Sequence, residues 1–382
     1  MLSIDRLTQY LASDPANPDL AGELADAYVR VGRYRDAADV LHALPVAAQQ
    51  RQGIQFRLAQ LDLATGDYLA AEQRLSPLWT ADQQNLALGH DLAFAQLCQH
   101  RLGDARAVLA VVEAAHPTQA AVQLLLARVE LLAGNFAGAE QHIETALSLE
   151  PLDATALGLR ALCRLDAGDM PGADAAAVAC LQHTPDQHEA LLAAGALALS
   201  RQQVELAGQH FSRALQRHPN SGRALSGLGQ VQMLGNQLEQ AEQTLQHAVA
   251  AMPDHIGTWH ALAWAQLLLG DIAGAEASYR DALLLDRNFG ESHGGLAIVE
   301  LLTGRVSEGE ASMRRALKLD PACVSGRYAK SLWLQQNGKE AESTAEFAEL
   351  IARGALPGIE GQDPAQVAQR LRSRMTSRSI TR

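Results

Sequence analysis

The sequence predicts an all-α solenoid made of about ten helix-turn-helix units. Three observations predict this fold class: a helix-breaking residue recurs along the chain, two amphipathic segments lie between successive breakers, and the apolar residues are mostly small or aliphatic. Apolar residues make up 48% of the 382 residues, whereas aromatic residues make up only 4%. This composition suits closely packed helices better than sheets.

Helix-breaking residues mark the period of the repeat. The markers are Gly32, Gly66, Gly103, Gly134, Gly168, Gln202, Asn236, Gly270, Gly304 and Gly338. Seven of the nine intervals are 34 residues, and the other two, 37 and 31, flank the third marker and cancel. We therefore expect a loop near residues 76–85 to have gained three residues and the next second helix to have lost them.

Each period predicts two amphipathic helices joined by a tight turn. The eighth period shows the large and small residues on either side of its turn at Gly270: Trp259, Leu262, Ala263, Ala275, Tyr279 and Ala282. Small residues let two helix backbones approach closely where they cross, and the larger ones fill the space beside the crossing. Glycine at the turn allows a positive φ at little cost, and a proline after the second helix ends that helix.

This pattern resembles the tetratricopeptide repeat family over roughly residues 18–350. Units of that family carry Leu and a small residue in the first helix, small, aromatic and small residues in the second, and a closing Pro. The signature recurs as Leu126, Ala127, Ala139, Ile143, Ala146 and Pro151, as Ala194, Gly195, Ala207, Phe211, Ala214 and Pro219, as Leu228, Gly229, Ala241, Leu245, Ala248 and Pro253, and as Leu296, Ala297, Gly309, Met313, Ala316 and Pro321. The resemblance implies a right-handed superhelix.

The chain divides into four predicted segments. Residues 1–17 are expected to hold an N-terminal capping helix near residues 4–13, and residues 18–350 the repeat array. Residues 351–362, with three Gly and a Pro, are predicted to be a linker. Residues 363–382 are predicted to form a basic amphipathic helix or tail, whose apolar and basic positions are Val367, Leu371 and Met375, and Arg370, Arg372, Arg374, Arg378 and Arg382.

Several units depart from the pattern. Pro45 is expected to shorten the second helix of the first unit. The fifth unit has Arg160 at a position usually held by Leu and Pro171 at the start of its second helix, which predicts a local irregularity. The tenth unit places polar residues where apolar or small ones are preferred: Lys330, Ser331 and Ser343. We therefore expect the array to weaken at its ends.

The resemblance also implies which residues meet a partner, since in that family the first helices line the concave face of the superhelix. Fifteen residues at groove-facing positions, most of them apolar, are predicted to bind a partner: Leu124, Leu131, Leu162, Leu165, Leu192, Leu199, Gln230, Met233, His260, Trp264, Leu267, Ile298, Leu301, Tyr328 and Leu332. A partner or the chain itself should cover an apolar stripe of this length. The alternatives to a peptide-binding groove are occupancy by the C-terminal helix and tight closure of the superhelix.

Other partners and chemistries are disfavoured. The formal charge of −12 opposes nucleic acid and anionic membranes. Nucleotide-binding, hydrolase and metalloprotease motifs are missing, and the histidines lack metal-ligand spacing, so we predict no cofactor, no metal and no enzyme activity. Chaperone adaptors of the family hold acidic tails with a Lys and Asn clamp, but this chain has other residues there: Gly22, Asp26, Phe56, Gln60, Ala93 and Leu97.

The chain is predicted to be cytoplasmic. Its N-terminus lacks the apolar stretch of a signal peptide, no run of eighteen apolar residues occurs, and the four cysteines form no C-x-x-C pair: Cys98, Cys163, Cys180 and Cys323. Only three of the 31 basic residues are lysines, a bias typical of GC-rich coding that favours a bacterial source: Lys318, Lys330 and Lys339. Trp79 and Trp333 are predicted to anchor helix interfaces.

These observations predict an interaction protein: a scaffold or chaperone-like adaptor that holds a peptide or helix of a protein partner in its groove. One alternative is an accessory subunit that presents substrates to a separately encoded transferase or hydroxylase. Another is a purely structural array whose end units stack between protomers, so homo-oligomerisation is possible.

Overall fold

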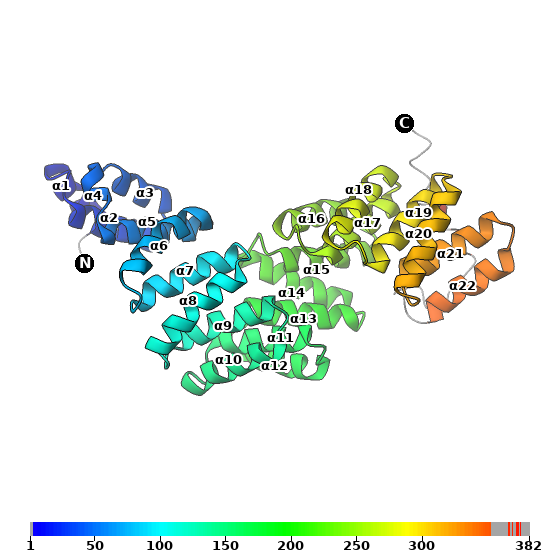
Figure 1. The fold of residues 1–382 in the computed structure, drawn as a ribbon, viewed down its shortest axis with the longest axis horizontal. Coiled ribbons are helices and arrows are strands. Elements are labelled where there is room, and N and C mark those ends of the chain that lie inside the picture. Colours follow the sequence, from blue (N-terminus) through cyan, green and yellow to red (C-terminus); the bar gives the residue numbers. More distant parts are fainter. Residues whose placement is uncertain (1–2, 353–365, 367–368, 370–371, 374, 376–382) are drawn as a thin grey trace. The chain divides into compact units, whose positions relative to one another are not determined.

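The computed structural model describes residues 3–352, 366, 369, 372–373 and 375, and these residues contain twenty-two helices and no strand (Figure 1). The helices up to the second repeat are α1 (Ile4–Ser13), α2 (Pro18–Arg30), α3 (Tyr34–His42), α4 (Val46–Gln49), α5 (Gln52–Thr65) and α6 (Tyr68–Ala81). The helices of the third to sixth repeats are α7 (Leu86–Cys98), α8 (Leu102–Ala115), α9 (Ala120–Leu132), α10 (Phe136–Leu149), α11 (Ala154–Asp166), α12 (Met170–His183), α13 (His188–Ser200) and α14 (Val204–Arg217). Those of the seventh to tenth are α15 (Gly222–Leu234), α16 (Leu238–Ala251), α17 (Ile256–Leu269), α18 (Ile272–Leu285), α19 (Gly290–Leu302), α20 (Val306–Leu319), α21 (Val324–Gln336) and α22 (Glu340–Ala352).

The turn inside each repeat holds one residue with a left-handed backbone. Seven of these residues are glycines, and the other three are His100, Gln202 and Asn236, with φ of 58°, 59° and 58°. The third turn therefore centres on His100, whereas Gly103 lies in the first turn of α8. With His100 as the third marker all nine intervals are 34 residues, so the predicted insertion and deletion around the third repeat are wrong.

Hydrogen bonds at the turn after α5 show why this position needs a positive φ. The Gly66 N–H donates to the Leu63 carbonyl (3.2 Å), and the Asp67 N–H donates to the Asp62 carbonyl (2.8 Å). This pairing of the last helical carbonyls requires a left-handed residue between the two donors. Asp67 then caps α6, because its carboxylate accepts the Ala70 N–H (3.0 Å). One short sequence thus ends one helix and begins the next.

Small residues sit where the helices cross, as the pattern predicts. A Cβ atom at Gly295 of α19 would come within 2.2 Å of the Tyr279 ring, and one at Gly227 of α15 within 2.3 Å of the Phe211 ring. Trp79, which lies inside α6, anchors a comparable contact over Gly89. These contacts couple each second helix to the first helix that follows it.

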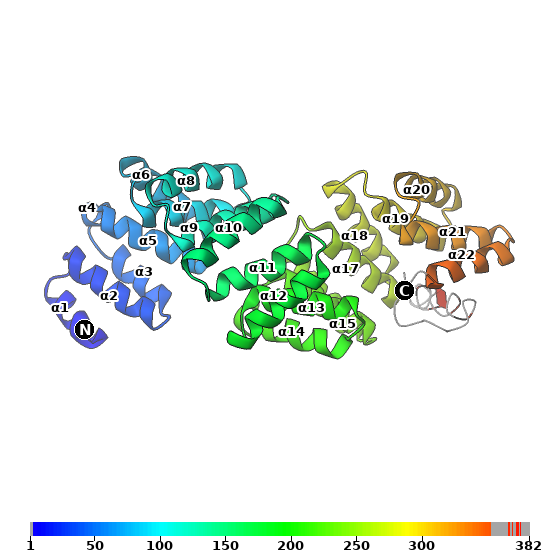
Figure 2. The ribbon, with the colours of Figure 1, turned by 90° about the horizontal axis from the view of Figure 1, so that it is seen from below.

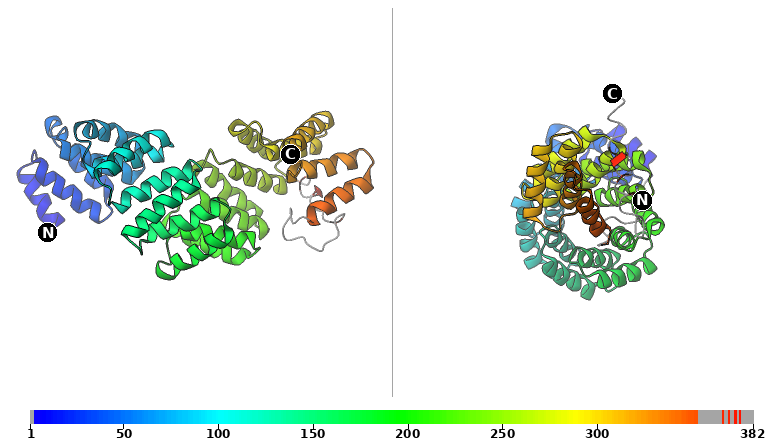
Figure 3. Two further views of the ribbon diagram at one scale, coloured as in Figure 1. Left: turned by 60° about the horizontal axis from the view of Figure 1, so that its bottom comes forward. Right: turned by 90° about the vertical axis from the view of Figure 1, so that its right-hand side faces the viewer.

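The chain divides into two compact units, Met1–Asp169 and Met170–Arg382, with the boundary inside the fifth repeat. Within each unit the helices pack on their chain neighbours, and the hairpins follow one another in order (Figures 1 and 3). The first helices of successive repeats also contact one another: α5 touches α7, and α13, α15, α17, α19 and α21 touch in sequence. The second helices lack comparable contacts, so the first helices form the inner side of each unit.

The predicted departures have identifiable structural consequences. The helix before Pro45, α3, has nine residues, whereas the second helices of the next repeats have fourteen. Arg160 forms an ion pair with Glu140 (3.2 Å). At the crossing of α21 and α22, the buried Ser331 and Ser343 hydrogen-bond to each other. The polar residues of the tenth repeat are therefore paired inside it.

One predicted boundary, between the array and the linker, differs in the structure. Helix α1 covers residues 4–13 and buries Leu7 against α2. The last helix, α22, continues to Ala352, two residues into the segment predicted as a linker. Most of the predicted linker and basic tail lies outside the described residues. Of the tail's five arginines, the structure describes Arg372. The division into cap, array, linker and tail stays a prediction.

Candidate partner-binding surface

The fifteen predicted groove residues lie on the first helices α9, α11, α13, α15, α17, α19 and α21. They occupy three positions of the 34-residue period, and the residues that share one position are called a row. The first row is Leu124, Leu192, His260 and Tyr328, the second is Leu162, Gln230, Trp264, Ile298 and Leu332, and the third is Leu131, Leu165, Leu199, Met233, Leu267 and Leu301. Four of the residues belong to the unit that ends at Asp169, and the other eleven lie on α13 to α21 in the unit that begins at Met170.

Burial changes along the third row. Leu199 on α13 and Met233 on α15 are half-buried, whereas Leu267 on α17 and Leu301 on α19 are 0% and 1% exposed. In the second row, Gln230 is exposed and Trp264 is half-buried, whereas Ile298 and Leu332 are buried. The first helices therefore keep apolar atoms at the surface on α13, α15 and α17, and lose them toward the end of the chain.

One apolar cluster accounts for the buried end of the rows. It joins residues of α17, α19, α21 and α22 to Met375, which is 0% exposed. The Tyr328 hydroxyl points to the Met375 sulfur at 4.0 Å, and the Tyr328 ring packs against Trp264 (6.2 Å between centroids) and Phe347 (5.7 Å). Burial raises the pKa of Tyr328 well above its usual range, and the charge of Arg372 opposes this rise. The described residues from 366 to 375, red in Figure 2, thus reach the inner side of the array at α21.

His260 is held by neighbours inside this unit. Its Nε2 atom lies 2.7 Å from the Ser292 hydroxyl, and its ring packs against Tyr279 and Phe289 (5.6 and 5.3 Å between centroids). Burial lowers its pKa to about 4, with Glu291 acting in the opposite direction. A neutral imidazole so placed serves packing between α17, α18 and α19. Its role in binding a partner stays a prediction.

An ion-pair network supports the last repeat. The Arg327 guanidinium, itself 7% exposed, donates to Glu346 and Glu349 (both 2.6 Å), and the Lys330 ammonium donates to Glu346 (2.7 Å). Burial raises the pKa of Glu346, but the hydrogen bonds from Lys330 and Arg327 outweigh it and hold that pKa below its usual range. These charges fix α21 against α22 and so position Tyr328.

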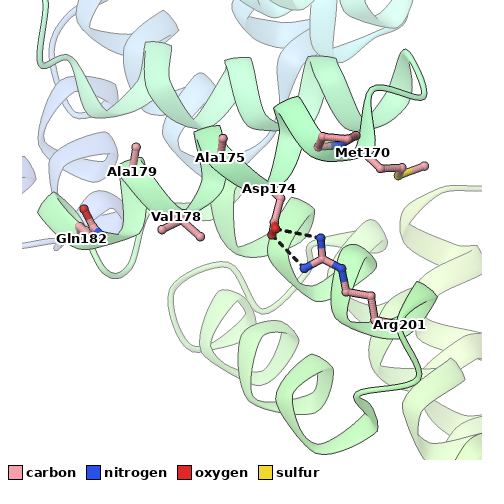
Figure 4. Close-up of a pocket in the computed structure, with 8 residues that line it drawn as sticks. Met170, Asp174, Ala175, Val178, Ala179, Gln182 and Arg201 are labelled. Atoms are coloured by element: carbon pink, nitrogen blue, oxygen red, sulfur yellow. Dashed lines mark hydrogen bonds and ion pairs between the residues drawn. The ribbon is translucent and has the colours of Figure 1, made fainter.

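A shallow depression of about 500 Å³ on α12 was not predicted from the sequence. It is lined by apolar side chains of α12, among them Met170 and Val178, and closed on one side by Arg201, which forms an ion pair with Asp174 (2.8 Å; Figure 4). Met170 and Val178 are 43% and 51% exposed. Their spacing of eight residues places them on one helix face, and this signal could have found the depression.

Other predictions concern cysteines, metals and membranes. The four cysteines are free, and burial raises the pKa of the Cys163 and Cys323 thiols to about 11 and about 12. Among the described residues, His, Cys, Asp and Glu form no group of three that could hold a metal ion. The part of the chain that the structure describes also has no helix with the length and apolar character needed to cross a membrane.

Comparisons with solved structures show the same fold. The chain is similar to the Cut9–Hcn1 hetero-tetramer of the APC/C, with a TM-score of 0.66 and 16% identity over 87% of this chain and 66% of that one. It therefore spans slightly less than two thirds of the length of that chain. It is also similar to two monomeric mutants of IFIT1, one solved with m7Gppp-AAAA and the other with Gppp-AAAA: both TM-scores are 0.57, with 15% and 14% identity over 93% of this chain and 90% of that one. At these identities the likeness shows the fold alone.

Comparisons of sequence identify the family. No curated protein matches the chain significantly. One sequence model of the tetratricopeptide repeat matches residues 3–61, 62–129 and 198–265, and a second matches residues 124–188 and 260–323. Together the matches cover most of the array. The chain therefore belongs to the tetratricopeptide repeat family.

Proposed function

We propose that this chain is a non-catalytic, cytoplasmic scaffold or chaperone-like adaptor, which binds an apolar peptide or amphipathic helix of a protein partner on the first helices α13, α15 and α17. The observation that carries the proposal is that three successive first helices keep partly exposed apolar side chains: Leu199 and Met233 of the third row and Trp264 of the second, together called the partner row. Tetratricopeptide repeats are interaction modules, and surfaces of this kind bind the apolar face of a helix through regularly spaced anchors.

Energetic considerations set the expected affinity. Burying these three apolar side chains contributes roughly 4.5 to 9 kcal/mol, and the cost of association takes back a similar amount. A micromolar dissociation constant requires about 8 kcal/mol net, so a partner segment of helix length must add contacts beyond these side chains to reach it. The exposed amide of Gln230, which lies on the same side of α15 as Met233, can add a polar contact that orients the partner.

Affinity purification from the native host, followed by mass spectrometry, tests the proposal. The wild type is compared with Trp264→Arg and Met233→Arg, which place a charge on the row. Leu284→Arg is the matched control, because Leu284 is an apolar residue on the second helix α18 that is 75% exposed. Circular dichroism verifies that all variants fold.

A partner recovered with the wild type and Leu284→Arg, but lost with both row variants, supports the proposal. The purified partner must then bind the row variants at least tenfold more weakly than the wild type. A partner that survives both row substitutions contradicts binding through this row.

The alternative function is that of an accessory subunit which presents substrates to a separately encoded transferase or hydroxylase. The same purification separates the two functions, because an accessory subunit would recover a catalytic protein in a fixed stoichiometry.

The IFIT1 structures contain the ligands m7Gppp-AAAA and Gppp-AAAA. For this chain we propose no nucleic-acid partner, since the formal charge of −12 opposes phosphate binding.

A further inference from the structure

The C-terminal segment presents two different faces. Its described residues Gln366, Gln369 and Ser373 are exposed and helical, and their spacings of three and four residues place them on one side of a helix. Met375 is buried and Arg372 is half-buried, and these two residues are also three apart. These five described residues therefore divide into an exposed polar side and a buried side, with Met375 as the apolar anchor.

The site that receives Met375 is made by residues predicted to bind a partner. Tyr328 contacts the Met375 sulfur directly, and Trp264 packs against the Tyr328 ring. Leu267 and Leu332 belong to the same cluster. The methionine side chain is unbranched and polarisable, so it makes favourable contacts with aromatic and aliphatic groups and adapts to an irregular gap between them. This is the kind of contact that an amphipathic partner helix makes with a groove.

The covalent link between the C-terminal segment and the array raises the occupancy of the contact between Met375 and Tyr328. Residues 353–365 link α22 to the segment, so the segment meets its site at an effective concentration on the order of millimolar. A segment with micromolar intrinsic affinity would then occupy the site in nearly all molecules. An external helix of similar chemistry must compete with it.

We propose that the described C-terminal residues Gln366, Gln369, Arg372, Ser373 and Met375 belong to a built-in ligand of the inner face formed by α17, α19 and α21, which a partner helix must displace before it can bind there. The occupant is a segment of this same chain. The partner that displaces it is an amphipathic helix with a methionine-like apolar anchor. The displacement step rests on the proposed function, whereas the docking of the segment does not.

A labelled peptide with the sequence of residues 363–382 tests the proposal on the full chain. Its binding to the wild type, Met375→Asp and Gln369→Asp is measured by fluorescence anisotropy. Met375→Asp puts a carboxylate on the buried face of the segment and should release it from its site. Gln369→Asp puts the same charge on the exposed face and should leave it docked.

The expected result is that Met375→Asp binds the peptide at least tenfold more tightly than the wild type and Gln369→Asp do. A peptide that itself carries Met375→Asp should bind none of the three chains. Circular dichroism on the three proteins confirms that the array is folded in each.

Equal binding of the peptide to all three chains would show that the site is open in the wild type and overturn the proposal. Lack of binding to any folded chain would overturn it as well, because the segment would then not be a ligand of this face. Neither outcome affects the proposed partner row, which is tested by Met233→Arg on α15, a helix that contributes no residue to the Met375 cluster.

Discussion

Ser331 of α21 and Ser343 of α22 hydrogen-bond to each other across the crossing of the last two repeat helices. The Ser331 hydroxyl lies 3.1 Å from the Ser343 carbonyl, and the Ser343 hydroxyl donates to the Ser331 carbonyl at 2.7 Å. The preceding repeat has Ala297 and Gly309 at the equivalent positions. Two serines fit here because each hydroxyl, although buried, has a backbone acceptor on the facing helix.

This pairing predicts how the crossing responds to substitution. Ser331→Ala keeps the close approach of the helices and leaves Ser343 bonded to the backbone, so it should lower the free energy of unfolding by only about 1 kcal/mol. Ser331→Leu overpacks the crossing and should cost about 2 to 3 kcal/mol. Urea denaturation checks both values. Equal stability of the two variants would mean that the crossing is not tightly packed.

Tyr279 on α18 predicts a stabilising substitution. Its side chain is 0% exposed, and its hydroxyl has no hydrogen-bond partner among the described residues, whereas Phe211 fills the equivalent site two repeats earlier. Tyr279→Phe removes an unsatisfied buried hydroxyl and should raise the free energy of unfolding by about 1 kcal/mol. Tyr328→Phe is the control, because it removes a hydroxyl that contacts Met375, and it should give no gain. A loss in Tyr279→Phe, measured by urea denaturation, would reveal a bonded hydroxyl.

The turn residues predict a pair of opposite effects. Gln202 adopts φ of 59°, which costs a residue with a Cβ atom about 1 kcal/mol, so Gln202→Gly should stabilise the chain by up to that amount. Gly66 adopts φ of 85°, and a Cβ atom built there meets nothing within 4 Å. Gly66→Ala should therefore cost about 1 kcal/mol through backbone strain alone. Thermal unfolding of the two variants measures both effects, and shifts of the same sign would contradict this account.

His260 predicts a pH dependence of stability. Its folded-state pKa of about 4 lies below the ordinary value of 6.5, because burial disfavours the charged ring. As the pH falls from 6.5 toward 4, the unfolded chain takes up a proton that the folded chain does not, so folding loses up to about 3 kcal/mol from this group. This contribution is fully present above pH 6.5.

Substitution isolates the contribution of His260 from those of the carboxylates. His260→Gln removes the titrating ring, so acidification from about pH 7.5 to about pH 4.5 should destabilise the wild type by about 2 to 3 kcal/mol more than the variant. Urea denaturation at both pH values gives the difference. Parallel losses in the two proteins would show that His260 is protonated in the folded chain.

The sequence alone predicts the helix-turn-helix repeat and the short second helix before Pro45, because the signals are local, whereas the irregularity expected at Arg160 stays a prediction. Glycine turns, small residues at crossings and amphipathic spacing act within one period of 34 residues, and the family matches confirm the repeat. The third turn was misplaced because Gly103 looks like a breaker in the sequence. The left-handed residue is His100, whose φ is set by the hydrogen bonds that end α7.

Only the tertiary structure decided which apolar residues remain at the surface. Leu199, Met233, Leu267 and Leu301 stand at the same position of successive repeats, yet the first two are half-buried and the last two are covered. The two covered leucines belong to one apolar cluster, which also contains Met375, a residue far away in the chain. The periodic pattern determines which side chain each repeat places at a given position. Whether that side chain stays exposed depends on contacts with segments far away in the sequence, and a local pattern does not show these contacts.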